Sequence, residues 1–253
     1  MKTERNQSNL ITFLILAIIF IGWEVVVRVM DTPVWILPAP SKIMQTLFSN
    51  TPLYGKASLI TLGEALVGLL FGVIAGTGAA ILLSLWPRLE QGVMTIAILV
   101  KSTPMVAIAP LLTIWLGFGV LPKVIITALL TFFPVLVNVI CGLQRTDLAL
   151  LDLFNSWHAT RWEIFRFVRM PNTLPYLFAA LKISAPLSLI SAVVAEWTGA
   201  SGGLGHTMWL AYNNLNLPFL FAAVFILGVA GVVSYGILTW AERRFVFWQQ
   251  IEV

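Results

Sequence analysis

Residues 143–175 read LQRTDLALLDLFNSWHATRWEIFRFVRMPNTLP, and this stretch decides how the chain is organised. Its charged side chains are Arg145, Asp147, Asp152, Arg161, Glu163, Arg166 and Arg169. Charges at this density are too costly for a lipid bilayer, so the stretch is predicted to lie in water. Large apolar residues such as Leu148, Leu151 and Val168 recur between the charges. Apolar side chains on a water-side segment indicate a surface that binds another molecule.

The rest of the chain is apolar enough for a membrane. The 253 residues are 59% hydrophobic and 10% charged, with a mean hydropathy of +0.93. Soluble domains carry about 25% charged residues, so this chain has too few charges to cover a water-facing surface. Its apolar runs exceed the roughly 18 residues of a spanning helix and lack the alternation of a membrane β-barrel. The sequence therefore predicts an all-α integral membrane protein.

Six membrane spans are predicted in one domain that covers residues 1–253. The spans cover about residues 10–29, 59–85, 91–117, 123–141, 174–197 and 219–240. Short helices in the membrane interface are expected at residues 41–48 and within residues 199–218. Arg and Lys concentrate on the side that holds both termini and residues 143–175, which predicts that this side is cytoplasmic. The net charge of +4 then reports orientation and does not indicate nucleic acid binding.

Small residues recur at intervals of four along the second span, at Gly68, Gly72 and Gly76 and then at Ala80 and Ser84. This spacing places them on one helix face, where another helix can approach backbone to backbone. The pattern predicts close helix packing and does not identify the partner helix.

The third span is interrupted by the polar run Lys101-Ser102-Thr103 and by Pro104. A proline leaves a backbone carbonyl free inside the membrane, which is tolerated only where protein or water supplies a partner. An ammonium group at this depth should face the bundle interior or an aqueous path. Lys101, Ser102 and Thr103 are therefore candidates for a translocation path, and a Lys101 in that path would favour an anionic or strongly polar solute.

Two further polar residues in the spans, Asn138 and Glu196, are also candidates for the path. For each candidate a structural role is the alternative. Lys101 could pair with a carboxylate such as Glu64 or Glu24, and Asn138 could form a hydrogen bond between spans. Glu196 could position the loop at the outer mouth, which is the favoured interpretation.

The 143–175 stretch is predicted to form a helix–turn–helix. Asp147 or Thr146 can cap a helix over residues 148–157, and Thr160 with Glu163 forms a capping box that starts a second helix. The bend falls at His158-Ala159, and Pro171 and Pro175 are expected to stop the second helix before the next span.

Here the sequence resembles the membrane subunits of bacterial binding-protein-dependent ABC importers. Their cytoplasmic signature is Glu-Ala-Ala, a Gly six positions after the Glu, and then Ile-x-Leu-Pro. In this chain Asp152-Leu153-Phe154 stands at the first block, His158 at the glycine and residues 168–171 at the last. The resemblance implies that this segment is a coupling helix that docks in a cleft of an ATP-binding subunit. His tolerates a positive φ less readily than Gly, so the angle of the bend is open.

The residues that the resemblance assigns to this docking are Asp152, Phe154, Trp157, His158, Ala159, Thr160, Arg161 and Trp162. The alternative is an amphipathic helix pair lying on the inner lipid surface, where its arginines would suit anionic lipid. Lipid binding alone does not explain the spacing of the motif.

Four other blocks, WILPAPSKI, STPMVAIAPLLTIWLGFG, TRWEIFRFVRMPNTLPYLFAALKIS and AVVAEWTGASGGLGH, resemble the nitrate/sulfonate/taurine permease branch of that family. This branch also includes permeases for the pyrimidine precursor of thiamine and for riboflavin. The resemblance implies a permease in the bacterial inner membrane that works with an ATP-binding subunit, an external solute-binding protein and a second permease copy, surrounded by lipid.

No cofactor is expected in this chain, and ATP with magnesium is expected on the partner subunit. The sequence lacks the phosphate-binding motif G-x-x-x-x-G-K-[ST], so any ATP must be hydrolysed elsewhere. His158 and His206 have no metal-ligand companions at useful spacing, and no metal site is predicted. A secondary, ion-coupled transporter is the alternative function, although no inverted repeat is visible. An intramembrane enzyme is disfavoured because the spans contain no Ser/His or paired-Asp set.

Overall fold

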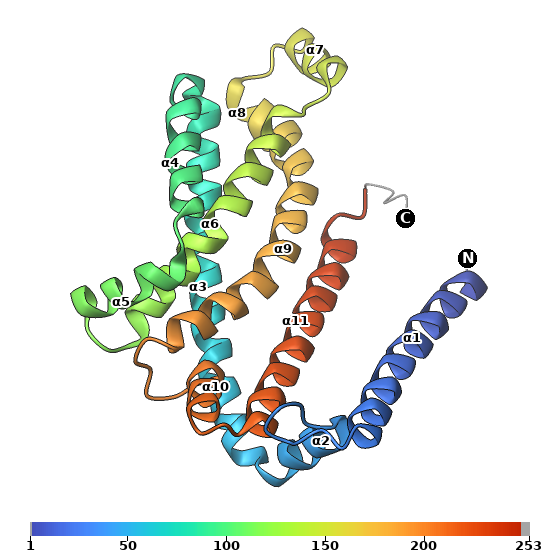
Figure 1. Ribbon diagram of the computed structural model, residues 1–253. Helices are drawn as coiled ribbons and strands as arrows, with labels where there is room; N and C mark the ends of the chain where they lie inside the picture. Colours follow the sequence, from blue (N-terminus) through green and yellow to red (C-terminus); the bar gives the residue numbers. More distant parts are fainter. Residues whose placement is uncertain (1, 249–253) are drawn as a thin grey trace.

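The computed structural model describes residues 2–248, and within this part the chain is helical and has no strand (Figure 1). The helices are α1 (Lys2–Val29), α2 (Pro40–Ser49), α3 (Thr51–Leu85), η1 (Pro87–Leu89), α4 (Glu90–Ser102), α5 (Met105–Leu116), α6 (Val120–Gln144), α7 (Leu148–Ser156), α8 (Arg161–Ile164), the π-helical turn η2 (Phe165–Arg169), α9 (Met170–Glu196), α10 (Leu204–Asn213) and α11 (Leu217–Phe245). The all-α fold class is confirmed for these residues.

Helices α3, α6 and α9 form the centre of the molecule. Their largest apolar core includes Leu83 of α3, Leu136 of α6 and Ala180 of α9, each at most 2% exposed. Gly68, Gly72 and Gly76 all face α6, where an added Cβ would overlap Thr127, Thr131 and the Phe132 carbonyl respectively. The helix that the small-residue stripe contacts is therefore α6, and the two backbones approach each other directly.

Four helices in the described residues are long and apolar enough to span a membrane: α3, α6, the continuous helix Arg161–Glu196 and α11. The pair Pro87–Ser102 and Met105–Leu116 would add a fifth span, broken by a bend of 93°. The predicted interruption of the third span is thus present as a sharp bend. The predicted first span lies in α1, and the count of six stays a prediction.

The prediction that Pro171 and Pro175 end the second hairpin helix is wrong. The helix runs on from Arg161 to Glu196. A π-helical turn at Phe165–Arg169 precedes the first proline, and there the Met170 amide donates to the Phe165 carbonyl. Pro171 follows this turn directly, so the backbone donor that it lacks falls at the wider turn, and Pro175 lies inside α9. The wider turn provides the continuity that an ideal α-helix with Pro171 would lack.

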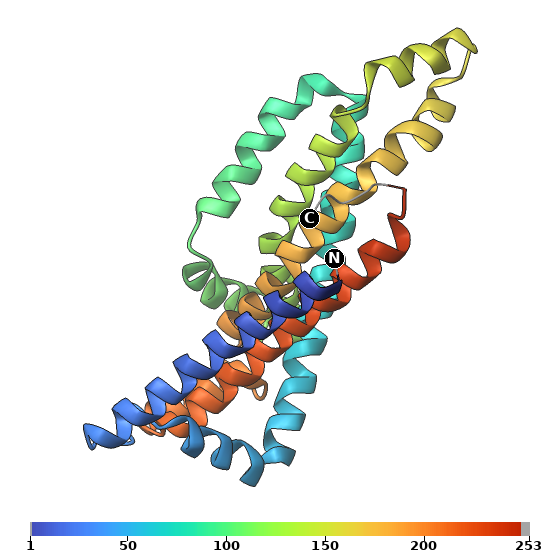
Figure 2. The ribbon, with the colours of Figure 1, turned by 90° about the vertical axis from the view of Figure 1, so that its right-hand side faces the viewer.

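The amino end of α1 and the carboxyl end of α11 run towards the end of the molecule that carries α7, whereas α2 and α10 lie at the opposite end (Figures 1 and 2). Here α1 stands apart from the central helices and meets α11 through Trp23 and Phe221, whose ring centroids are 5.8 Å apart. Glu24 of α1 pairs with Arg28 at 2.6 Å, as the spacing predicts, and accepts a hydrogen bond from the Ser41 amide of α2.

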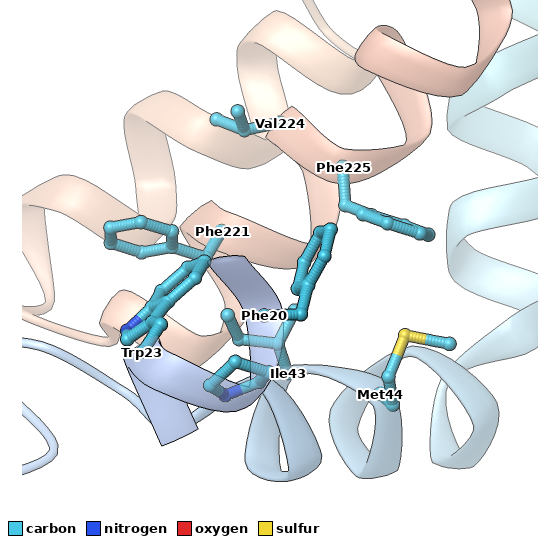
Figure 3. Close-up of a pocket in the computed structure, with 8 residues that line it drawn as sticks. Phe20, Trp23, Ile43, Met44, Phe221, Val224 and Phe225 are labelled. Carbon is cyan, nitrogen blue, oxygen red and sulfur yellow. The ribbon is translucent and has the colours of Figure 1, made fainter. Parts of the chain in front are cut away.

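A groove of about 430 Å³ lies between α1, α2 and α11 (Figure 3). Figure 3 shows Phe20 and Trp23 of α1 and Phe221 and Phe225 of α11 around Ile43 of α2. Its lining is apolar apart from the indole N–H of Trp23, which is buried, so this groove offers almost no polar surface to a solute.

Candidate functional site

The helix–turn–helix at residues 143–175 is present, and α7 forms its first arm at the far end of the molecule (Figure 1). Asp147 caps α7, since its side chain accepts a hydrogen bond of 2.9 Å from the Ala149 amide. Of the two predicted caps, the structure uses Asp147. A cap of this kind satisfies amide donors that the first helical turn leaves free.

The bend occurs at His158, whose φ is +57°. This is the left-handed region, which glycine reaches without strain and which costs other residues energy. The amide of Ala159 donates to the Phe154 carbonyl and that of His158 to the Asn155 carbonyl, so the chain closes a compact turn after α7. The histidine therefore adopts the positive φ that a glycine at this position allows.

The second arm starts with the predicted capping box. The Glu163 amide donates to the Thr160 hydroxyl at 3.3 Å, and the Thr160 amide donates to the Glu163 carboxylate at 2.7 Å. The capping box is confirmed, and it fixes where the chain turns from the bend into the long helix towards the centre of the molecule.

Aromatic side chains on the two arms are exposed. Trp157 is 68% and Trp162 is 65% exposed. The Trp157 ring tilts against Phe154, with 5.9 Å between the ring centroids, and the Trp162 ring stacks on Phe165 at 5.6 Å. Both tryptophans otherwise face outward. Asp152, His158, Thr160 and Arg161 are also exposed, while Phe154 and Ala159 are half-buried. The hairpin thus presents apolar rings and charges together at one end of the molecule.

A second candidate site lies at the break between α4 and α5. Lys101, Ser102 and Thr103 are all exposed there, and Thr103 is extended before Pro104, with φ −77° and ψ 129°. The Lys101 ammonium lies 4.5 Å from the centre of the Phe133 ring of α6, a cation–π contact. The suggested pairing of Lys101 with Glu64 or Glu24 is wrong, because Glu64 pairs with Lys123 at 2.5 Å and Glu24 with Arg28.

The other path candidates lie elsewhere. Asn138 is half-buried on α6 and donates to the Pro134 carbonyl of its own helix at 2.8 Å, so the suggested hydrogen bond between spans is absent. Its side chain can reach this carbonyl because the two residues stand four apart on one helix face. Glu196 is 1% exposed at the end of α9, where Thr61 donates to it at 2.6 Å. Among the described residues, neither Asn138 nor Glu196 is hydrogen-bonded to Lys101, Ser102 or Thr103.

Glu196 also accepts hydrogen bonds from the backbone amides of Gly205 and His206, at the start of α10. The sequence analysis did not identify two ion pairs between helices, the buried Lys123–Glu64 pair and the partly buried Lys182–Glu242 pair, the latter at 2.7 Å. The signal in the sequence was the presence of acidic and basic side chains inside apolar runs, where each charge needs a partner of opposite sign. Which acid meets which base depends on how the helices pack.

These features define a helical membrane protein with a polar break in one span and an exposed, capped hairpin at one end. The family model described as binding-protein-dependent transport system inner membrane component matches residues 68–247, and the chain belongs to this family. It is a membrane permease subunit of an ABC importer, and the resemblance seen in the sequence is confirmed.

Named relatives agree with this assignment. A probable ABC transporter permease protein of Haemophilus influenzae is 32% identical over 92% of this chain and 96% of its own length. The formylaminopyrimidine transport permease protein ThiX of Halalkalibacterium halodurans is 32% identical over 98% of this chain and 99% of its length. The riboflavin transport system permease protein RibX of Chloroflexus aurantiacus is 28% identical over 92% of this chain and 88% of its length.

The fold is similar to that of solved transporters. A chain of the MetNI methionine ABC transporter in an inward-facing conformation superposes with a TM-score of 0.66. It is 21% identical in sequence, and the match covers 78% of this chain and 96% of that one. An amino acid ABC transporter gives the same TM-score of 0.66 at 18% identity, over 79% of this chain and 97% of that one.

Proposed function

We propose that this permease subunit forms a path for a small polar or anionic solute through the bacterial inner membrane. The observation that carries the proposal is the break between α4 and α5, where Lys101, Ser102 and Thr103 are exposed. An exposed ammonium group within a broken span is costly unless water or a polar solute reaches it. A positive charge at that point attracts anions and repels cations.

Two copies of the chain are proposed to enclose this path. In one copy the α4–α5 segment stands at the outside of the central helices (Figures 1 and 2). If lipid surrounded Lys101, its charge would be unsolvated. In a dimer, the α4–α5 breaks of the two copies would instead face a shared polar interior. Each copy is proposed to have six spans with both termini in the cytoplasm, the orientation that the distribution of Arg and Lys favours.

The α7–α8 hairpin is proposed to dock on an ATP-binding subunit, which would hold magnesium and ATP and perform the hydrolysis. The exposed rings of Trp157 and Trp162 support this role, because buried aromatic rings dominate the energetics of many interfaces. Binding through Asp152, Phe154, His158, Ala159, Thr160 and Arg161 would let the subunit move the hairpin together with the rigid helix Arg161–Glu196.

The solute is proposed to arrive on an external solute-binding protein. Among the possible solutes, a pyrimidine precursor of thiamine is the first to test, because the similarity to ThiX extends over nearly the full length of both chains. Nitrate-like and sulfonate-like anions are the next class, since a putative aliphatic sulfonates transport permease protein of Bacillus subtilis is 27% identical.

The docking site is tested with the double variant Trp157→Asp/Arg161→Glu in the full chain, co-expressed with its ATPase subunit. The variant is expected to insert into the membrane and to lose co-purification of the ATPase by at least about tenfold, the effect of 1.4 kcal/mol. The matched control is Trp248→Asp, which changes an exposed Trp outside the hairpin and should keep the partner. Retention of the ATPase by the double variant would show that the docking surface lies elsewhere.

Transport itself is tested in proteoliposomes that contain the assembled complex and the binding protein. Uptake of the formylaminopyrimidine is expected to need ATP and to persist when proton and sodium gradients are collapsed. Uptake driven by an ion gradient in the absence of ATP would instead indicate a secondary transporter.

A further inference from the structure

Two acids and one base are buried together where α3, α6 and α9 meet, at the end of the molecule that carries α10. Glu64 is 4%, Lys123 is 8% and Glu196 is 1% exposed. These are the charged side chains that face the cluster in residues 2–248, and α10 adds His206, whose backbone amide donates to Glu196. With both acids ionised, the cluster would have a net charge of −1 without solvent. An unbalanced buried charge of this kind is strongly unfavourable.

The hydrogen bonds show which acid carries the charge. Glu196 faces three donors: the Thr61 hydroxyl at 2.6 Å on one oxygen, and the amides of Gly205 and His206 on the other. Thr61 in turn accepts from the Leu204 amide at 2.8 Å. A carboxyl group surrounded by donors is stabilised in its ionised, acceptor-only form. Glu196 is therefore the carboxylate of the cluster.

Glu64 has a different environment. One of its oxygens accepts from the Lys123 ammonium at 2.5 Å, while the other, Oε2, is buried and has no donor among the described residues. Leaving a buried carboxylate oxygen unpaired costs free energy, which a proton on that oxygen would remove. Thr61 and Glu64 stand three apart on one face of α3, and Thr61 donates to Glu196 at 2.6 Å, so the two carboxyl groups lie beside each other. A proton on Oε2 would have an acceptor there.

We propose that Glu64 and Glu196 hold one proton between them, carried on Glu64 Oε2 and donated to the Glu196 carboxylate. The cluster is then neutral, with the Lys123 ammonium balancing one carboxylate. Every polar atom of the two carboxyl groups has a partner in this arrangement. The proton site joins α3 to α9, and through Glu196 it holds the amino end of α10. It does not depend on the transport function proposed above, because it concerns contacts within one chain.

The neighbouring glycines support this role of Glu196. A Cβ on Gly203 or Gly205 would overlap the Glu196 carboxyl group, and Gly203 has a φ of +107°. The loop before α10 therefore approaches the carboxylate with its backbone. Thr61 and Glu196 cap α10 from other helices, since the residue before α10, Gly203, has no side chain to do so.

The assignment predicts an asymmetry between two conservative variants of the purified full-length protein. Glu64→Gln provides an amide donor towards Glu196 and a carbonyl acceptor for Lys123, as a protonated Glu64 does. It is expected to change the melting temperature by less than about 2 °C. Glu196→Gln turns an amide nitrogen towards groups that are themselves donors, and is expected to lower the melting temperature by about 5 °C or more.

Infrared spectroscopy at neutral pH detects a protonated carboxyl group directly. Such a group has a carbonyl stretching band that shifts in heavy water. The wild-type protein is expected to show this band, and Glu64→Gln to remove it. The matched control is Glu242→Gln, which changes a buried acid paired with Lys182 alone and should leave the band unchanged.

Three results would overturn the proposal. The first is the absence of the band in the wild type, or its persistence in Glu64→Gln. The second is the reverse asymmetry, in which Glu64→Gln unfolds the protein and Glu196→Gln is tolerated. The third is a wild-type protein that lacks the carboxyl band and whose melting temperature rises with sodium, a rise that Glu64→Gln abolishes. This result would place a metal cation where the proton is proposed.

Discussion

At the scale of single residues, the most informative position is His158. It stands at the motif glycine of the hairpin and has a φ of +57°. A left-handed conformation costs a residue with a Cβ about 1–2 kcal/mol relative to the usual helical region. The surrounding turn, with its hydrogen bonds from His158 and Ala159 back to α7, holds the residue there.

His158→Gly is expected to relieve this strain and to stabilise the hairpin by about 1 kcal/mol. Limited proteolysis of the full chain at residues 155–161 should become slower. His158→Val is the opposing variant, because a β-branched residue is least tolerant of a positive φ. It should speed proteolysis and weaken co-purification. Equal behaviour of the two variants would contradict the strain argument.

At the scale of helices, the contact between α3 and α6 depends on the absence of side chains. Gly72 faces the Thr131 hydroxyl and the Ala128 carbonyl of α6. Thr131 cannot turn away freely, because its hydroxyl donates to the Thr127 carbonyl at 2.8 Å. Gly78 lies on the same helix and has open space where a Cβ would stand.

Gly72→Ala is expected to destabilise the protein by about 1–3 kcal/mol, the usual cost of overpacking. Gly78→Ala is its control and should be neutral or slightly stabilising, since alanine is the better helix former. Thermal unfolding of the two purified variants, followed by circular dichroism, compares them. A Gly72→Ala variant as stable as Gly78→Ala would show that the backbones can move apart without cost.

The sequence predicts much of the hairpin at this scale and less of its continuation. The Thr160–Glu163 capping box follows from four adjacent residues, and the structure contains it. Pro171 was expected to end the helix, and instead a π-helical turn at Phe165–Arg169 carries the helix past it. A proline excludes an ideal α-helix, but a single wider turn satisfies the same backbone groups, and no local pattern distinguishes the two cases.

At the scale of the whole molecule, the proposed path depends on where Lys101 lies in the assembly. Its ammonium group lies over the Phe133 ring, exposed in one copy, and no carboxylate pairs with it among the described residues. Lys101→Glu is expected to lower ATP-dependent uptake of an anionic or polar solute by at least about tenfold, while Lys101→Arg keeps most of it. ATPase activity in detergent is the control for assembly. Unchanged uptake by Lys101→Glu would place Lys101 outside the path.

The sequence by itself determined the class of the protein and the position of its exposed hairpin. Both depend on local quantities: the hydropathy of long runs, the density of charge in residues 143–175 and the capping residues within them. It also indicated that small residues on one face of α3 would allow a close helix contact.

Only the tertiary structure decided which buried groups meet. Glu64 has Lys123 as its partner, although these residues are 59 positions apart, and Glu196 fixes α10 together with Thr61, 135 positions away. Helices of similar hydropathy can pack in many pairings, and a charge inside an apolar run requires a partner without specifying one. The choice depends on the shape of the facing helix surfaces, of which the glycine face of α3 against α6 is the clearest case.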